Sequence, residues 1–476
     1  MISFSQFAPD ADPTTPGVIT ACENLVPTVR GYKGGPSGAD VGLNALAAAA
    51  VSAVGITKLD ATSRFIVGTA TKLYEKNGLT WTDVSGAAYS ASSSIPWRFA
   101  QFGNTTLAVN KQDVLQSSTS GAFAAVATAP KAAAMCVVNG FVMLANTNDG
   151  VNNDEDRWWC SGYMDVTNWT TSIASQCASA RLVDTPGAIT CVKALGYDVV
   201  AYKDRSIYIG QYGGAAVWNF RLIPGDAGCS SQEAIADIGS AHIFISHSDI
   251  YIFNGSTTAP IGAVIREWFF NDLDPTFSLR IRHIHDRANS LLYFHYPRRG
   301  GGGALNGCIV YNYKADKWGV AHRTIDCAVE YVASGFDYDG IPMSDWDSWP
   351  AVAYDSAYWT ASSLYPAYIG TDHKLYSLTG GSTSSSLTTG DYGSEDMYYL
   401  LRRVTTRYLD RPDSATMTNY TQTIHGGAWT EDTTTTENNG RFDRIKSAPW
   451  HRAKFDYVGD VEVSGVSADM KPSGVL

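Results

Sequence analysis

Bulky hydrophobic residues in this chain occur in short runs that end in turn residues, and the same pattern returns many times. It is clearest in the segments 72–81 (KLYEKNGLTW), 205–214 (RSIYIGQYGG), 249–258 (DIYIFNGSTT), 308–320 (CIVYNYKADKWGV) and 373–381 (HKLYSLTGG). In each segment, β-branched and aromatic residues precede an Asn-Gly, Gly-Gly or Ala-Asp pair, which favours a tight turn. Each segment therefore predicts a strand, a turn and a second strand.

The spacing of these segments predicts how the hairpins are assembled. One apolar anchor can be chosen in each repeat: Tyr74, Val114, Trp158, Tyr208, Tyr251, Tyr311 and Tyr376. Their separations are roughly 40 to 65 residues, as expected for a four-stranded propeller blade with loops of variable length. We therefore predict an all-β fold built around a β-propeller. The spacing widens near Tyr311 and Tyr376 and leaves the number of blades open.

Three regions differ in pattern and define the expected domains. Residues 1–49 are rich in proline and glycine and predict an extended N-terminal arm, lying across a neighbouring subunit or adding a strand to its own domain. Residues 50–385 carry the repeated hairpins and predict the propeller, with an inserted loop at 336–359. Residues 386–476 alternate over longer strands and predict a small C-terminal antiparallel β-sandwich-like domain.

Composition and charge narrow the classes of function. The 476 residues include 44 Gly, 26 Tyr and 13 Trp with only 17% charged residues, a balance typical of strands and turns. A formal net charge of −11 argues against a basic groove that grips nucleic acid, although it suits a conduit through which DNA slides. Solubility alone explains the charge equally well.

Cysteine usage and the apolar runs bear on the compartment. The eight cysteines are scattered without a Cys-x-x-Cys pair, so we expect reduced, buried thiols. We see no leader segment and expect assembly in a host cytoplasm. The Ala-rich run 43–55 is shorter than the roughly 20 apolar residues that cross a bilayer, so no membrane insertion is expected.

Three histidines form the strongest metal-like pattern. A hairpin turning at residues 286–289 would place His283, His285 and His295 on one face, and imidazole nitrogens suit Zn²⁺. A fourth ligand is not evident, and a half-polar strand face at a subunit contact explains the same residues. We therefore predict no cofactor and keep the three histidines as weak metal candidates.

Other candidates concern contacts with partners. Arg298 and Arg299 precede a glycine run that predicts a flexible hairpin tip, where they could touch DNA or a neighbour. The loop 336–359 is rich in acidic and aromatic residues, and its partner-contact candidates are Asp337, Asp339, Trp346 and Trp349. The chain contains no Gly-x-Ser-x-Gly elbow and no sialidase-type turn, so we predict that it is not an enzyme.

Order and pattern along most of the chain resemble a known family. The run GFVMLANTNDG…DRWWCSGYMDVTNW…DTPGAITCVKALGYDVVAYKDRSIYIGQY (140–212) and the stretch 286–318 resemble the tail hub or nozzle proteins of short-tailed bacteriophages, also called packaged-DNA-stabilisation proteins. The opening NLVPTVRGYKG and the closing WHRAKFDYVGDVEVSGVSADMKPSG are similar too.

The resemblance implies a structural virion protein of the tail. Such a subunit forms a sixfold homo-oligomeric ring below the portal and adaptor, continues the DNA channel, and helps to retain and release the genome. It would contact tail fibre or needle proteins and passing double-stranded DNA without sequence recognition. The family has no active site to transfer. The alternative hypothesis is a carbohydrate-binding propeller, acting as an adhesin or receptor-binding protein through the loop 336–359.

Overall fold

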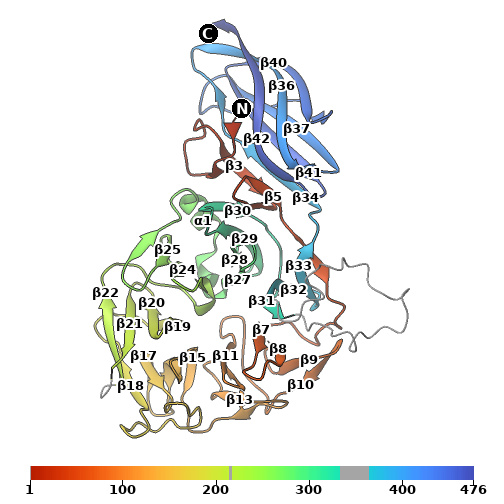
Figure 1. Ribbon diagram of the computed structural model, residues 1–476. Coiled ribbons are helices and arrows are strands. Elements are labelled where there is room, and N and C mark those ends of the chain that lie inside the picture. The colour runs from red at the N-terminus through yellow and green to blue at the C-terminus, as the bar shows by residue number, and fades with distance from the viewer. Residues whose placement is uncertain (1, 214–216, 333–363, 476) are drawn as a thin grey trace, which may run out of the picture.

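Six separate four-stranded antiparallel sheets and a seventh unit of four strands surround one axis in the described residues (Figure 1). This is a computed structural model, and it describes residues 2–213, 217–332 and 364–475. The predicted all-β propeller is confirmed. In each unit the first strand lies innermost, and the first strands of successive units are neighbours around the axis.

The units follow chain order. Unit 1 is β7 (Ser52–Thr57), β8 (Ser63–Gly68), β9 (Leu73–Asn77) and β10 (Thr80–Asp83); unit 2 is β11 (Arg98–Phe102), β12 (Thr105–Val109), β13 (Gln116–Ser118) and β14 (Ala124–Ala125). Unit 3 is β15 (Lys131–Val138), β16 (Phe141–Asn148), β17 (Asn153–Cys160) and β18 (Ala178–Arg181); unit 4 is β19 (Ile189–Leu195), β20 (Asp198–Lys203), β21 (Ile207–Tyr212) and β22 (Trp218–Ile223). Unit 5 is β23 (Ile235–Asp237), β24 (His242–Ile245), β25 (Ile250–Phe253) and β26 (Thr258–Pro260); unit 6 is β27 (Arg282–Asp286), β28 (Leu291–Pro297), β29 (Leu305–Asn312) and β30 (Lys317–Val320). Unit 7 joins β31 (Cys327–Val332), β32 (Leu364–Ile369) and β33 (Leu375–Gly380) to β6 (Ser37–Asp40).

The repeated sequence pattern corresponds to the third strand of each unit. Six of the anchors lie in these strands, and Val114 lies two residues before the remaining one, β13. Tyr208 and Trp158 illustrate the cause: the third strand packs apolar side chains between neighbouring sheets, and both residues belong to one core cluster shared by units 3 and 4. The sheets pack face to face because each buries apolar residues on both sides.

The last unit closes the ring with a strand from the opposite end of the chain. Tyr376 and Ser377 of β33 pair with Asp40 and Ala39 of β6, in antiparallel register. The expected return strand within 373–381 is therefore wrong, because after β33 the chain leaves for the second domain and the N-terminal segment occupies the outer position instead. β31 then lies beside β7, which completes the circle.

A continuous sheet joins the propeller to the C-terminal domain. From β30 of unit 6 it continues through β4 (Leu25–Pro27) and β5 (Tyr32–Gly34) to β42 (Glu462–Val475), β36 (Met397–Asp410) and β40 (Arg441–Ala448). The fully buried Tyr32 lies in this junction. Its hydroxyl donates to the Trp318 carbonyl oxygen at 2.9 Å and accepts from the Phe7 amide at 2.5 Å. The two domains therefore share one hydrogen-bonded ladder.

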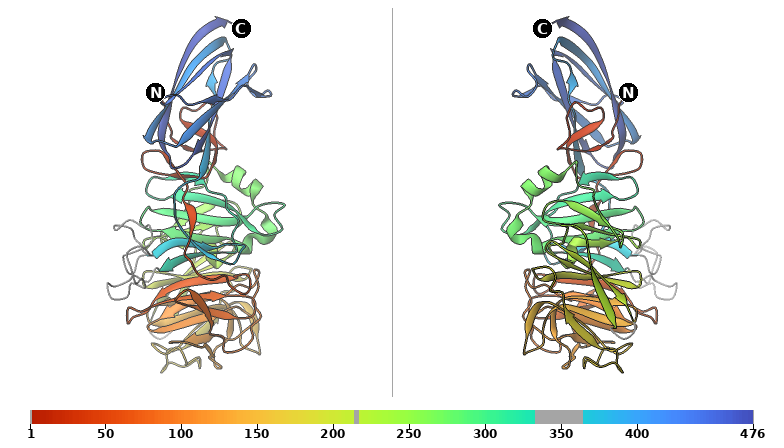
Figure 2. Two further views of the ribbon diagram at one scale, coloured as in Figure 1. Left: turned by 90° about the vertical axis from the view of Figure 1, so that its right-hand side faces the viewer. Right: turned by 90° about the vertical axis from the view of Figure 1, so that its left-hand side faces the viewer.

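The C-terminal domain is a β-sandwich stacked on one side of the propeller (Figures 1 and 2). Its second sheet contains β2 (Gln6–Phe7), β3 (Val18–Glu23), β34 (Ser384–Thr389), β41 (Trp450–Val458), β37 (Ser414–Gln422) and β38 (Thr430–Glu431), with β35 (Tyr392–Gly393) and β39 (Thr435–Thr436) at its margins, while β1 (Ile2–Ser3) pairs with β42. The rings of Phe442 and Phe455 meet between the sheets with their centroids 5.4 Å apart.

Residues 1–49, the predicted N-terminal arm, thus supply six strands to three sheets. The predicted boundary between the propeller and the C-terminal domain, at position 385, falls inside β34.

Helical structure is confined to short connections in the described residues. These are η2 (Gln232–Ala234), α1 (Arg266–Asp272) and η3 (Pro275–Arg280). The Asp10 carboxylate accepts hydrogen bonds from the amides of Glu267 and Trp268 at the start of α1, which ties the N-terminal segment to the propeller. In the described ranges, no helix has both the length and the hydropathy of a membrane span.

Candidate functional site

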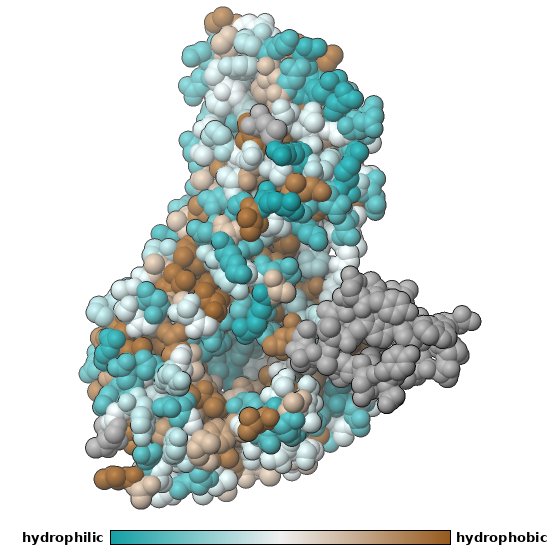
Figure 3. Space-filling model, viewed as in Figure 1, coloured by the Kyte–Doolittle hydropathy of each residue, from teal (hydrophilic) through white to brown (hydrophobic). Residues whose placement is uncertain are grey.

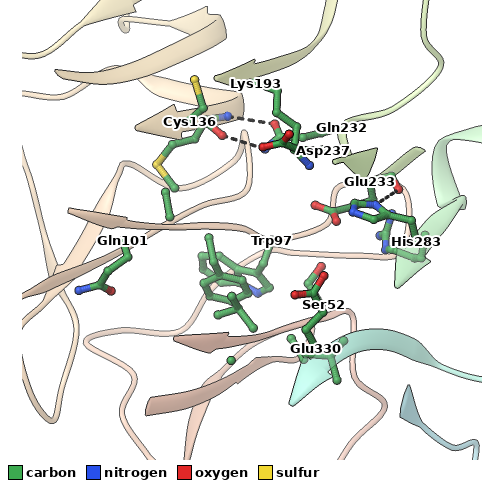
Figure 4. A pocket seen from close by; sticks show the side chains of 18 of the residues that line it. Ser52, Trp97, Gln101, Cys136, Lys193, Gln232, Glu233, Asp237, His283 and Glu330 are labelled. Carbon is green, nitrogen blue, oxygen red and sulfur yellow. Dashed lines mark hydrogen bonds between the residues drawn. The ribbon is translucent and has the colours of Figure 1, made fainter. Parts of the chain in front are cut away.

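A cavity of about 400 Å³ lies on the propeller axis, and all seven units contribute to its wall. The face shown in Figure 3 is hollowed near the centre of the propeller. Figure 4 shows Glu233, His283 and Glu330 on one side of the cavity and Gln101 and Cys136 toward the other. The inner strands bring these residues together because each unit directs its first strand at the axis. This cavity is the candidate functional site.

Two contacts of η2 cross the axis. The Arg98 Nη1 of unit 2 donates to the Glu233 Oε1 at 3.1 Å, although Glu233 precedes unit 5, three positions away around the ring. The Gln232 side-chain amide donates to the Met135 carbonyl oxygen at 2.8 Å and accepts from the Met135 amide at 3.1 Å, which reaches unit 3. Gln232 and Glu233 therefore place their side chains inside the ring of inner strands.

Charge pairing controls the ionisation of Glu233. Burial by itself raises the pKa of this carboxyl, but the positive charges of Arg98 and Arg282 outweigh burial and bring the pKa down to about 2. Burial lowers the pKa of Arg98 to about 10, so the guanidinium remains charged at neutral pH. Arg282 is also buried, and its Nη1 donates to the Ile281 carbonyl oxygen at 3.2 Å. Glu233 is therefore an anion that is bound by Arg98 and further stabilised by the positive charge of Arg282.

Other polar groups of the wall have spare hydrogen-bonding capacity. Glu330 accepts a hydrogen bond from the His285 amide and forms no ion pair with a described residue; burial raises the pKa of its carboxyl. The Lys193 ammonium donates to the Ile235 carbonyl oxygen at 2.9 Å, which uses one of its three N–H groups. Half-buried Phe99 adds an aromatic surface.

The three histidine candidates do not share one face, and that prediction is wrong. Asp286 pairs with Leu291, so four loop residues separate the strands, His283 lies opposite Phe294, and His295 lies opposite Arg282. Opposite residues share a face and successive residues alternate, so His295 lies on the face opposite to His283 and His285. Within the described ranges, no group of three His, Cys, Asp or Glu residues is placed to hold a metal ion.

Each histidine has a different local environment. The His283 Nδ1 donates to the Glu233 carbonyl oxygen at 2.7 Å, and burial lowers the pKa of His283 to about 4. The His285 Nε2 lies 3.2 Å from the Tyr313 hydroxyl oxygen. The fully buried His295 has its Nε2 3.9 Å from the Cys308 Sγ, and burial lowers its pKa to about 3. All three side chains are explained as parts of the propeller wall and core.

The two arginine candidates are bound to the molecule itself. The Arg298 Nε donates to the Asp272 carboxylate at 2.8 Å, and the Arg299 Nε donates to the Leu273 carbonyl oxygen at 3.2 Å. Both therefore anchor the β28–β29 turn to α1 and the residue that follows it. The other partner-contact candidates, Asp337, Asp339, Trp346 and Trp349, lie outside the described residues.

The cavity was missed by sequence reasoning. Its charged residues come one or two at a time from units that are about 45 residues apart, so no local motif connects them. The one available signal was the polar pair Gln232–Glu233 immediately before an apolar strand at the expected axis. All eight cysteines are buried and free, and burial raises the pKa of the cavity-lining Cys136 to about 12. The thiols therefore add no nucleophile to the site.

Comparisons with known proteins leave the family open. No protein-family model and no curated protein matches this sequence. Among solved structures, the N-terminal domain of Nup159 is similar over 49% of this chain and 70% of its own, with 12% identity and a TM-score of 0.29. The extracellular domain of the putative hybrid two component system BT4673 from B. thetaiotaomicron is similar over 79% of this chain and 44% of its own, with 10% identity and a TM-score of 0.36. Similarities this low carry no argument about function.

Proposed function

We propose that this chain is a structural subunit of a short-tailed bacteriophage tail. In this proposal it is a nozzle or hub protein that forms a homo-oligomeric ring of six below the portal and adaptor, continues the DNA channel, and helps to retain and release the genome. It would be located in the virion tail and assembled in the host cytoplasm. Tail fibre or needle proteins would be further partners, and no catalytic step is part of the role.

One structural observation carries the proposal: the ladder that runs from unit 6 through β4 and β5 into the sandwich. A subunit that connects neighbours above and below must transmit contacts between its two ends without bending. Continuous strand pairing, together with the buried hydrogen bonds of Tyr32, resists bending better than a flexible linker does. The resemblance of the segments 140–212 and 286–318 adds the expected biological setting.

The geometry also constrains where DNA would run. The axial cavity holds about 400 Å³, and the side chains of Gln232 and Glu233 form hydrogen bonds across it to Arg98 and Met135. A double helix therefore does not pass through the propeller, and in the proposed ring it would pass through a lumen enclosed by several subunits. The net charge of −11 would limit adhesion of DNA to that lumen.

Imaging of the assembled particle tests the proposal. In cryo-electron microscopy of the virion that contains this chain, we expect six copies around the DNA path, immediately below the adaptor. A particle in which the chain lies outside the tail axis, or forms a trimer that projects outward, would refute it. The carbohydrate-binding alternative was based on the loop 336–359, which lies outside the described residues, so no observation here favours it as a second function.

A further inference from the structure

The axial cavity has the composition of a small-molecule site. Its volume of about 400 Å³ falls within the range of roughly 300–1,000 Å³ that is usual for ligand pockets. Apolar surface from Val54, Phe99 and Val137 alternates with a few polar groups that converge from different units.

The charges around the cavity cancel. The lining carboxylates of Glu233, Asp237 and Glu330 are matched by the lining cations of Lys193 and Arg282 and by Arg98, which does not line the cavity but pairs with Glu233. His283 is neutral near pH 7, because burial lowers its pKa to about 4. A site with no net charge offers little net attraction to an ion. A neutral ligand pays a smaller desolvation cost on entering, so neutrality of the wall favours a neutral ligand.

The polar groups with spare capacity include both donors and acceptors. The Glu330 carboxylate can accept additional hydrogen bonds, and the Lys193 ammonium has two further N–H groups. A ligand that pairs with all of them must itself carry several groups that both donate and accept. Hydroxyl groups have this property, and the C–H faces between them can pack on the Phe99 ring.

We propose that the axial cavity binds a neutral polyhydroxylated molecule of monosaccharide size. The ligand hydroxyls would donate to Glu330 and accept from Lys193, with one sugar face against Phe99. This site is separate from the loop 336–359 and does not depend on the proposed role in a tail.

Saturation-transfer difference NMR on the full chain tests this site. The probes are D-glucose, D-galactose, D-mannose and N-acetyl-D-glucosamine at millimolar concentration, because an affinity near 1 mM is sufficient for detection. We expect at least one probe to bind the wild-type protein. Glu330→Gln and Phe99→Leu should each weaken that binding about tenfold or more, because each removes a charge-assisted hydrogen bond or the aromatic surface.

A matched variant controls for the charge change. Glu155→Gln makes the same substitution at a side chain that is 61% exposed, and it should leave binding unchanged. Circular dichroism and the melting temperature check that each variant is folded; if Phe99→Leu does not fold, Glu330→Gln decides. The proposal is overturned if no probe binds the wild-type protein, if Glu330→Gln binds as well as the wild type, or if D-glucosamine or D-gluconate binds more tightly than D-glucose.

Discussion

The hydrogen bond across the propeller axis should be measurable as a coupling between distant units. The Arg98 Nη1 and the Glu233 Oε1 are 3.1 Å apart, and the side chains of Arg98 and Glu233 are 6% and 33% exposed. With an effective dielectric constant of about 20, two unit charges at that distance attract by about 5 kcal/mol, and desolvation offsets part of this attraction. Removing one partner of a buried pair typically costs about 3–5 kcal/mol.

The two single variants should differ in cost. Glu233→Gln leaves the guanidinium groups of Arg98 and Arg282 without this counter-ion, and because the Glu233 side chain is 33% exposed we expect a loss in unfolding free energy of about 2–3 kcal/mol, below the cost for a fully buried pair. Arg98→Met should cost less, because Arg282 still compensates the Glu233 carboxylate. In the double variant the costs should fall short of additivity by about 1–3 kcal/mol.

Urea unfolding at pH 7, followed by tryptophan fluorescence, provides these free energies. The exposed pair Arg403–Asp443 in the sandwich serves as the control, since both side chains are well exposed to solvent and Asp443→Asn should change stability by less than about 1 kcal/mol. A coupling energy between Arg98 and Glu233 below about 0.5 kcal/mol would refute the cross-axis contact, because residues that do not interact show additive effects.

The Glu233 carboxyl should make the stability of the folded chain depend on pH in the acid range. The pKa of Glu233 is about 2 in the folded chain against an ordinary value of 4.5. Stability from its ionised form is therefore fully present above pH 4.5 and is lost as the pH falls from 4.5 toward 2. Glu233→Gln should make stability depend less on pH within that window. An unchanged slope would show that the folded carboxyl titrates normally.

Three further outcomes follow from buried groups. Tyr32→Phe should lower the unfolding free energy by about 2–4 kcal/mol, since it leaves the Trp318 carbonyl and the Phe7 amide without their partner, whereas Tyr197→Phe at an exposed position should change it little in the same urea experiment. His295 has a pKa of about 3 in the folded chain against an ordinary value of 6.5, so the stability of the fold should fall as the pH drops from 6.5 toward 3. In His295→Leu the melting temperature should change less with pH over that range. Ellman's reagent should label none of the eight buried thiols at pH 8 in the native chain and all eight in denaturant; rapid labelling of a native thiol would contradict their burial.

Local sequence signals predicted the repeating part of the fold because the information is itself local. Tyr74, Tyr251 and Tyr311 each lie in a third strand, and a tight turn follows within a few residues. The apolar pattern and the turn chemistry are then contained in about ten residues. The long C-terminal strands were predictable for the same reason, since residues alternate between the sandwich core and solvent.

Pairings between distant segments had no such signal. Ala39 pairs with Ser377, and Tyr32 pairs with Val463, across more than 300 and 400 residues of sequence, respectively. Short strands such as β5 and β6 contain three or four residues, too few to show a period. The proline-rich composition indicated an extended chain correctly, but extension alone does not say which sheet edge the chain occupies.

The histidines of unit 6 show why site residues were harder to predict than strands. The sequence RHIHDRANSLLYFHY requires a hairpin under almost any interpretation, and that hairpin is present. Which side chains share a face, however, depends on whether the loop between the strands has an odd or an even number of residues. A loop longer or shorter by one residue would have placed His295 on the face of His283 and His285. The observed loop of four residues instead directs His295 toward Cys308 and leaves His283 to anchor Glu233 at the axis. The side chains that meet on one face of a hairpin therefore depend on the number of loop residues, which strand propensity does not predict. Here a loop of four residues places His283 beside the axial cavity and His295 on the other face, so the three histidines form no cluster.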